Sequence, residues 1–239
     1  MKSAINGAEL RVYSSGQGPP LLLLHGGPGI GDSTAPIAEL LDSRFRAVRF
    51  DQRGCGESSL TPPYDLPTLM ADIEALRVQQ GAENWIVAGH SWGADVALAY
   101  TLTHPERVRV LLHLSGTGVQ NDRGWKEAYQ RGLAEGREIQ HDLGPVNTEA
   151  KRDYLRSWRE WIRSPDLLRR LAECPVPALF VVGSEDIRPG WPNAQLAALM
   201  PFGRFEVIQG AGHLLWDTHG PELQATLLSF LKESVQTPA

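Results

Sequence analysis

The stretch Gly89–Gly93, with the sequence GHSWG, decides the fold of this chain. It directly follows the apolar run Trp85–Ala88 and directly precedes Ala94–Leu102, which is apolar nearly all round. The short run predicts a buried strand, and the longer one predicts a buried helix. A serine on a tight strand-to-helix turn is the typical setting of an exposed nucleophile, because small neighbours let the chain close around it. We therefore predict that Ser91 is a nucleophile at the positive end of a helix dipole.

Short apolar runs and helical patterns alternate along most of the chain. Most of the runs lack polar alternation, as expected of strands in a parallel sheet that is covered on both faces. The strand-like runs are Pro20–Leu24, Arg46–Phe50, Trp85–Ala88, Val108–Leu114, Pro177–Val182 and Arg204–Ile208. Asn6-Gly7 predicts a hairpin before the first of them, and Leu66–Leu76 and Leu223–Leu231 have helical spacing. This alternation predicts an α/β doubly wound fold.

The alternation is interrupted between Gly118 and Cys174, where no strand-like run occurs. Two helical stripes rich in aromatic residues lie there instead, one over 125–133 and one over 154–162. We therefore predict a core formed by residues 1–118 and 173–239, and a small helical cap formed by residues 119–172. The alternative is that this segment is simply two surface helices with solvated charges.

Composition limits the class of protein. The chain has 239 residues, 42% of them hydrophobic, and a net charge of -5, which suits a folded globular protein and argues against general nucleic-acid binding. The cap segment holds 11 of the 23 basic residues but also 9 acidic ones, so its charge does not predict a nucleic-acid-binding surface. No run is long enough for a membrane span, and Met1–Asn6 does not read as a signal peptide.

Two cysteines, Cys55 and Cys174, are too few for a disulfide framework or a structural zinc site. No metal-ligand cluster such as H-E-x-x-H occurs, so we predict neither a metal nor another cofactor. The chain is predicted to be a cytoplasmic protein that acts on a small molecule, without a membrane or nucleic-acid partner. The sequence carries no signal for the oligomeric state.

A serine nucleophile needs a base, and seven histidines are available. His213 is the candidate, because it ends the loop Gly210–His213 just beyond the last predicted strand. His90 adjoins the serine, so its side chain is expected to point away from the hydroxyl. His219 precedes Gly-Pro and is interpreted as a helix-entry residue, and His104 is expected to be structural.

The base needs an acid that holds its tautomer and stabilises the imidazolium. Asp186 is favoured over Glu185, because Glu185 immediately follows the predicted strand and has less loop to turn it inward. Glu185 is the second candidate, with a solvated loop charge as its alternative role. The order Ser91, Asp186, His213 is the one expected for this fold class.

Acyl transfer also needs hydrogen-bond donors for the oxyanion. One is expected to be the amide of Trp92, the residue after the nucleophile, and the second the amide of Gly27 in the loop His25–Gly29, HGGPG. The competing interpretation, a phosphate-binding loop, is disfavoured because neither a Walker A nor a G-x-G-x-x-G pattern is present.

Together these motifs resemble the α/β-hydrolase superfamily over nearly the whole chain. With Asp51–Ser58, DQRGCGES, and the loop His25–Gly29, the chain is similar to the proline iminopeptidase branch. The resemblance implies a sheet of about eight mostly parallel strands flanked by helices, with a cap insertion. It also implies release of an N-terminal residue whose ammonium group is held by cap carboxylates. The predicted cap is about half the usual length, and the serine follows His90 rather than glycine.

Substrate contacts are expected from the cap. The candidates are the aromatic residues of the two stripes and one carboxylate that lies between two tryptophans, namely Trp125, Trp158, Glu160 and Trp161. Arginines on the second stripe would equally suit an anionic substrate, or are solvated helix charges.

Three functions are weighed. The first is a serine hydrolase that acts through an acyl-enzyme on small carboxylic esters, lactones or related acyl compounds. The second is a proline iminopeptidase-like aminopeptidase. The third is a non-catalytic binding protein on a hydrolase fold, which the complete set of motifs disfavours. Dehalogenase and epoxide-opening chemistry need a carboxylate nucleophile, and position 91 is a serine.

Overall fold

A single twisted sheet forms the centre of the computed structural model, which describes residues 1–119, 123–138 and 144–236. The described strands have the order β1-β2-β4-β3-β5-β6-β7-β8. Their bounds are β1 (Lys2–Ile5), β2 (Ala8–Ser15), β3 (Pro20–Leu24), β4 (Arg46–Phe50), β5 (Trp85–His90), β6 (Val108–Leu114), β7 (Ala178–Gly183) and β8 (Gly203–Ile208). All neighbours from β4 to β8 pair in parallel, and β2 is antiparallel to both β1 and β4. The mostly parallel eight-stranded sheet predicted from the sequence is confirmed.

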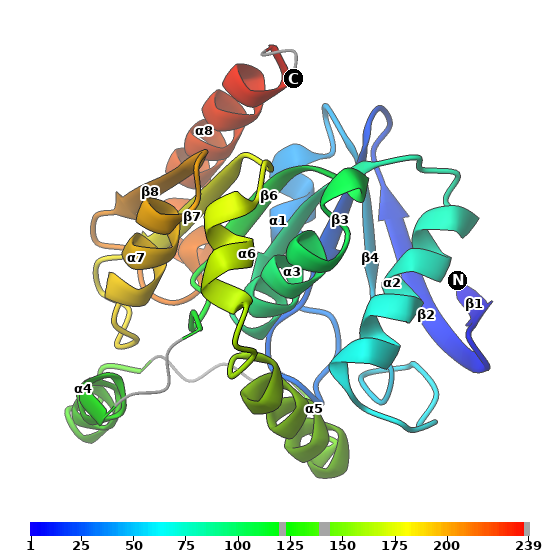
Figure 1. Cartoon of the computed structure of the whole chain (residues 1–239), viewed down its shortest axis with the longest axis horizontal. Coiled ribbons are helices and arrows are strands. Elements are labelled where there is room, and N and C mark those ends of the chain that lie inside the picture. The colour runs from blue at the N-terminus through cyan, green and yellow to red at the C-terminus, as the bar shows by residue number, and fades with distance from the viewer. Residues whose placement is uncertain (120–122, 139–143, 237–239) are drawn as a thin grey trace.

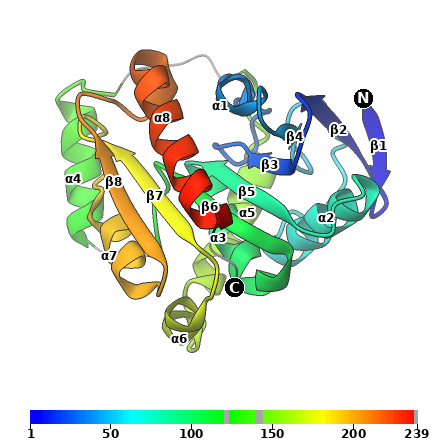
Figure 2. The ribbon, with the colours of Figure 1, turned by 90° about the horizontal axis from the view of Figure 1, so that it is seen from above.

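Helices cover both faces of the sheet (Figures 1 and 2). α1 (Ala35–Leu41) and α8 (Leu215–Gln236) pack on one face. α2 (Leu66–Gln79), α3 (Trp92–Thr103) and α7 (Trp191–Leu199) pack on the other, and the short 3-10 helix η1 (Pro105–Arg107) follows α3. α8 is kinked at His219, two residues before Pro221. No helix in the described part of the chain is long and apolar enough to cross a lipid bilayer.

Strand β3 illustrates why these residues form a central strand. Its four leucines, Leu21–Leu24, are all fully buried. Alternate side chains of a strand point to opposite faces, so Leu22 and Leu24 join the cluster under α2 and α3, while Leu21 and Leu23 join the cluster under α1 and α8. A continuous apolar run is what a strand covered on both faces requires.

Three helices follow β6 in the segment predicted to be a cap. They are α4 (Arg123–Ala134), α5 (Thr148–Trp161) and α6 (Leu167–Glu173), and Figure 1 shows α4 and α5 standing apart from one another below the sheet. Both α5 and α6 pack on the core. The residues buried in the same cluster as α3 are Ala150, Tyr154 and Trp158 of α5 and Leu167 and Leu171 of α6. Residues 120–122 and 139–143 of the predicted cap segment lie outside the described residues.

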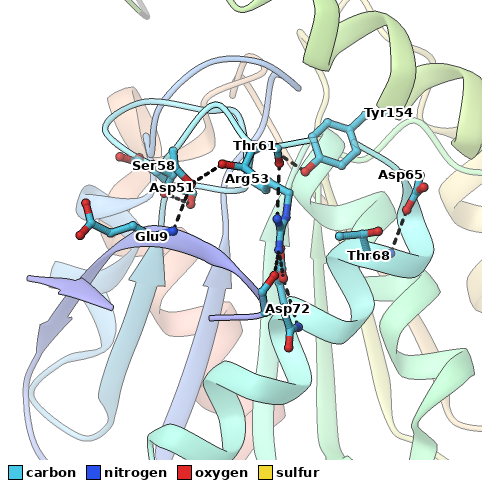
Figure 3. Close-up of polar contacts among 11 residues, drawn as sticks. Glu9, Asp51, Arg53, Ser58, Thr61, Asp65, Thr68, Asp72 and Tyr154 are labelled. Atoms are coloured by element: carbon cyan, nitrogen blue, oxygen red, sulfur yellow. Dashed lines mark hydrogen bonds and ion pairs between the residues drawn. The ribbon is translucent and has the colours of Figure 1, made fainter. Parts of the chain in front are cut away.

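A buried ion pair lies beneath α5 and joins it to the core (Figure 3). Arg53 donates from Nε to Asp72 Oδ2 at 2.9 Å and from Nη2 to Asp72 Oδ1 at 2.6 Å. The hydroxyl of Tyr154 on α5 donates to the backbone oxygen of Arg53 at 3.0 Å. Buried charges persist only when they are paired and hydrogen-bonded, so this pair holds α2 against the loop after β4, and the bond from Tyr154 ties α5 to the same loop.

Candidate active site

Ser91 lies where the direction of winding changes in the sheet. The chain runs from β3 to β4 on one side and continues through β5 on the other, and ligands of α/β sheets bind at the carboxyl ends of strands at such a switch point. Ser91 has φ 55° and ψ −123°, a backbone conformation that residues other than glycine rarely adopt. A Cβ at Gly89 would lie 2.0 Å from the backbone oxygen of Gly93, so the turn closes only with glycine there. This is the geometry of a nucleophile elbow.

His213 and Asp186 meet at the ends of neighbouring strands. His213 follows β8 and Asp186 follows β7, and His213 Nδ1 lies 2.6 Å from Asp186 Oδ2. In the neutral imidazole, a proton on Nδ1 that is donated to this carboxylate leaves the lone pair on Nε2. Burial raises the pKa of Asp186, but the hydrogen bond from His213 and the charge of Arg188 outweigh it, and the pKa falls below its ordinary value. Asp186 is therefore ionised and can hold the base.

The other candidates for acid and base do not join this pair. Glu185 lines the same pocket but is exposed, and its Oε1 is 3.4 Å from the hydroxyl of Ser184. His219 lies 2.8 Å from the hydroxyl of Thr218, and His104 ends α3. Of these, only His213 and Asp186 are bonded to one another, and both line the pocket that Ser91 lines.

His90 has a role that sequence reasoning missed. Its side chain was expected simply to point away from the serine, whereas its Nε2 lies 3.0 Å from the carbonyl oxygen of His213. Its ring is 4.7 Å from the rings of both His213 and Trp216. Burial, followed by the charge of His213, lowers the pKa of His90 to about 3. His90 is therefore neutral, and it donates from Nε2 to the backbone of the loop that carries His213.

The loop after β3 approaches the serine closely. A Cβ added at Gly26 would lie 3.1 Å from Ser91 Cβ, and Gly26 and Gly27 both line the pocket beside Ser91. Gln52, from the Asp51–Ser58 motif, links this loop to the residue after the serine. It accepts from Trp92 Nε1 at 3.0 Å, and its Nε2 donates to the backbone oxygen of His25 at 3.0 Å. Gln52 was not singled out from the sequence; its position two residues after the end of the buried strand β4 was the available signal.

A pocket of about 560 Å³ opens over Ser91. Among the described residues, its charged lining comprises two guanidinium groups and four carboxylates, on Arg137, Arg188, Glu138, Glu185, Asp186 and Asp217. From the cap, α4 contributes Tyr129 and Leu133. No three His, Cys, Asp or Glu side chains among the described residues are grouped as a metal site would need.

The four residues expected to contact substrate are not among those that line this pocket. Trp158 is buried, stacks on Trp161 at 4.9 Å and meets the ring of Trp92 edge-on at 6.0 Å. Glu160 is exposed on α5. Trp125 stacks on Tyr129 at 5.4 Å, one turn along α4, so it lies behind a residue that does line the pocket. Among the described residues of the predicted cap, those that line the pocket belong to α4 and the segment just after it, namely Tyr129, Leu133, Arg137 and Glu138.

Comparison with known proteins agrees with this architecture. Residues 19–135 match the family model described as alpha/beta hydrolase fold. Over 101 residues the chain is 46% identical to the proline iminopeptidase of Neisseria gonorrhoeae. The matched stretch covers 40% of this chain and 32% of that protein. Over 172 residues it is 34% identical to a probable proline iminopeptidase of Leptolyngbya boryana, which covers 69% of this chain and 52% of that one. The chain thus matches about a third to a half of the length of these relatives.

The fold itself extends over the whole chain. A meta-cleavage product hydrolase from Pseudomonas fluorescens superposes with a TM-score of 0.78 at 19% identity, over 98% of both chains. The chain is an α/β hydrolase. Within that superfamily, its matches in sequence place it on the proline iminopeptidase-like branch.

Proposed function

We propose that this protein is a serine hydrolase that acts through an acyl-enzyme on small carboxylic esters or related acyl compounds. The observation that carries the proposal is the 2.6 Å contact between His213 Nδ1 and Asp186 Oδ2 in the pocket that Ser91 lines. Ser91 Oγ attacks the acyl carbon while His213 Nε2 takes its proton. His213 then returns that proton to the leaving alcohol. Water, activated by the same base, hydrolyses the ester of Ser91.

The developing oxyanion is stabilised by two backbone amides in this proposal. They belong to Trp92, at the start of α3, and Gly27, in the loop after β3. A single donor of this kind contributes roughly 3 kcal/mol to the transition state. The bonds from Gln52 to Trp92 and to His25 support both amide-bearing segments at once.

A pocket of about 560 Å³ suits a small acyl substrate. The carboxylate that the cap contributes from its described residues, Glu138, is already bound by Arg188 at 2.6 Å. Because a paired carboxylate attracts an ammonium group less, an uncharged ester is the substrate class that we favour.

The test compares p-nitrophenyl acetate and butyrate hydrolysis by the wild-type protein and by Ser91→Ala. We expect the wild-type protein to hydrolyse these esters and to be labelled by a fluorophosphonate probe. Ser91→Ala should lose more than about 10³-fold in kcat, because the nucleophile is gone, and should not be labelled. A folded wild-type protein that neither hydrolyses an ester or amide nor takes the label would instead be a binding protein on this fold.

A second candidate, an aminopeptidase of the proline iminopeptidase type, is favoured by the charge of the pocket. Its described lining carries four carboxylates against two guanidinium groups, an excess of negative charge that would attract a substrate ammonium. The relatives named above bear that activity in their names. Proline p-nitroanilide assayed beside p-nitrophenyl acetate separates the two: hydrolysis of the anilide without the ester would reverse our ranking.

We propose a reducing, cytoplasmic setting for this activity. Cys55 and Cys174 are both free and buried. Burial raises the pKa of the Cys55 thiol to about 12, which keeps it protonated and unreactive.

A further inference from the structure

One guanidinium group connects the acid of the candidate triad to the cap. Arg188 follows Asp186 by two residues, and its side chain is 15% exposed. It contacts the core on one side and the segment at the end of α4 on the other. No sequence motif pointed to this residue.

On the core side, Arg188 donates two hydrogen bonds to one oxygen of the Asp186 carboxylate. Its backbone N–H donates to Oδ1 at 2.9 Å, and its Nη1 donates to the same oxygen at 3.1 Å. The other oxygen, Oδ2, accepts from His213. Each carboxylate oxygen thus has its own partner, and the plane of the carboxylate is set by Arg188 and His213 together.

On the cap side, Arg188 is held by two residues. Glu138 accepts from Nη2 at 2.6 Å and from Nη1 at 3.0 Å, a two-point contact that orients the planar guanidinium. The ring of Tyr129, on α4, lies 5.2 Å from the guanidinium carbon. α4 also approaches the loop that carries Asp186, because a Cβ at Gly132 would lie 2.5 Å from Ile187 Cβ.

We propose that Arg188 is a positioning residue through which the α4 segment sets the orientation of Asp186, so that the triad is fully assembled when Glu138 and Tyr129 hold the guanidinium. The proposal rests on the proposed function, since it concerns the same Ser91 chemistry. The cap then does more than cover the pocket: its docking determines how well His213 is held.

This arrangement has an electrostatic consequence that a purely structural role would lack. Arg188 places a positive charge beside Asp186, and Glu138 places a negative charge beside Arg188, so the two side chains contribute to the field around the candidate site with opposite signs. The other titratable groups that face the pair are His90 beneath the ring, Tyr129 on α4, and Glu185 and Asp217 on the loops around the pocket. Removing Arg188 or Glu138 should therefore shift the pH profile of the reaction in opposite directions.

The experiment measures kcat, KM and the pH dependence of kcat/KM with p-nitrophenyl acetate. In Arg188→Met, kcat/KM should fall about 10- to 100-fold, mainly through kcat, because His213 is then held less well in the geometry that the reaction needs. The midpoint of its acid limb should move to higher pH. Glu138→Gln should lose less, about 3- to 10-fold, and its acid limb should move to lower pH, because it leaves the charge of Arg188 uncompensated. Arg188→Lys, which keeps the charge, should keep the acid limb of the wild-type protein while recovering only part of kcat.

Two comparisons keep the test decisive. Arg131→Met removes an exposed cation from α4 and should leave kcat and the pH profile unchanged. The double variant Arg188→Met/Glu138→Gln should lose less than the product of the two single losses, because both act through one contact. Wild-type turnover combined with unshifted acid limbs in both single variants would overturn the inference and leave the proposed function standing. Absence of turnover and of fluorophosphonate labelling in the wild-type protein would overturn the proposed function itself.

Discussion

His90 Nε2 lies 3.0 Å from the carbonyl oxygen of His213, and their rings are centred 4.7 Å apart. The residue that precedes the candidate nucleophile thus supports the loop that carries the candidate base. Because His90 is buried and neutral, it donates this bond without adding a second charge beside the imidazole of His213. The turn after β5 and the loop after β8 are thereby joined directly.

The neutral state of His90 predicts a pH-dependent stability. An unfolded histidine takes up a proton below about pH 6.5, whereas folded His90 does so only near pH 3. Between these values the unfolded state binds more protons, so the contribution of His90 to the unfolding free energy falls as the pH falls, by up to about 1.4 kcal/mol per pH unit. The difference in unfolding free energy between pH 7 and pH 5, obtained from urea unfolding, measures this contribution.

The matched control for this prediction is His90→Gln, whose amide can also donate to the carbonyl of His213. Its unfolding free energy should decline less between pH 7 and pH 5 than that of the wild-type protein. Equal declines in the two proteins would mean that His90 titrates normally in the folded state.

The ion pair beneath the cap predicts a large loss of stability. Asp72 is fully buried and accepts twice from Arg53 (Figure 3). Asp72→Asn leaves the Arg53 guanidinium buried without its counter-charge, which should cost about 3–5 kcal/mol of unfolding free energy. The comparison is Arg152→Ala, which removes the exposed pair with Asp153 and should leave the denaturation midpoint unchanged. Similar midpoints for both variants would contradict this account.

The close approach of α3 to β3 predicts a different sensitivity at two glycines. A Cβ at Gly93 would lie 2.0 Å from the backbone oxygen of Leu24, which has no room to move inside the sheet. Gly93→Ala should therefore destabilise the protein by about 3 kcal/mol or more, or prevent folding. A Cβ at Gly212 would have no heavy atom within 4 Å, so Gly212→Ala should leave the thermal midpoint nearly unchanged. Thermal unfolding followed by circular dichroism compares them.

The lining of the pocket predicts which cap residues affect substrate binding. Tyr129 lines the pocket and Glu160 is exposed outside it. We expect Tyr129→Ala to raise KM for aryl esters several-fold, because it removes an apolar wall of the pocket. Glu160→Gln should leave KM for both aryl esters and proline p-nitroanilide unchanged. A raised KM for the anilide alone in Glu160→Gln would restore this carboxylate as an ammonium site.

Much of the core could be predicted from local pattern. The Asn6-Gly7 turn joins β1 and β2 with both residues at positive φ, and the apolar run at Pro20–Leu24 is a strand from end to end. The burial of α3 on all sides also agrees with its sequence. These features depend on neighbours along the chain, where periodicity and backbone sterics act. The short helices α1, α6 and α7 had no such signal, because a few turns of helix are stabilised mainly by what they pack on.

The sequence by itself determined the positions of the central strands and of the longer helices, and the turn that presents Ser91, because glycine spacing and apolar periodicity constrain the local backbone. Only the tertiary structure decided which partners meet. It brought Asp186 rather than Glu185 to His213, gave His90 and Gln52 their bonds, and placed Arg188 between Asp186 and Glu138. It also turned Trp158 into the core, away from the pocket. Contacts between segments up to 123 residues apart depend on how strands and helices pack, and no local pattern encodes that packing.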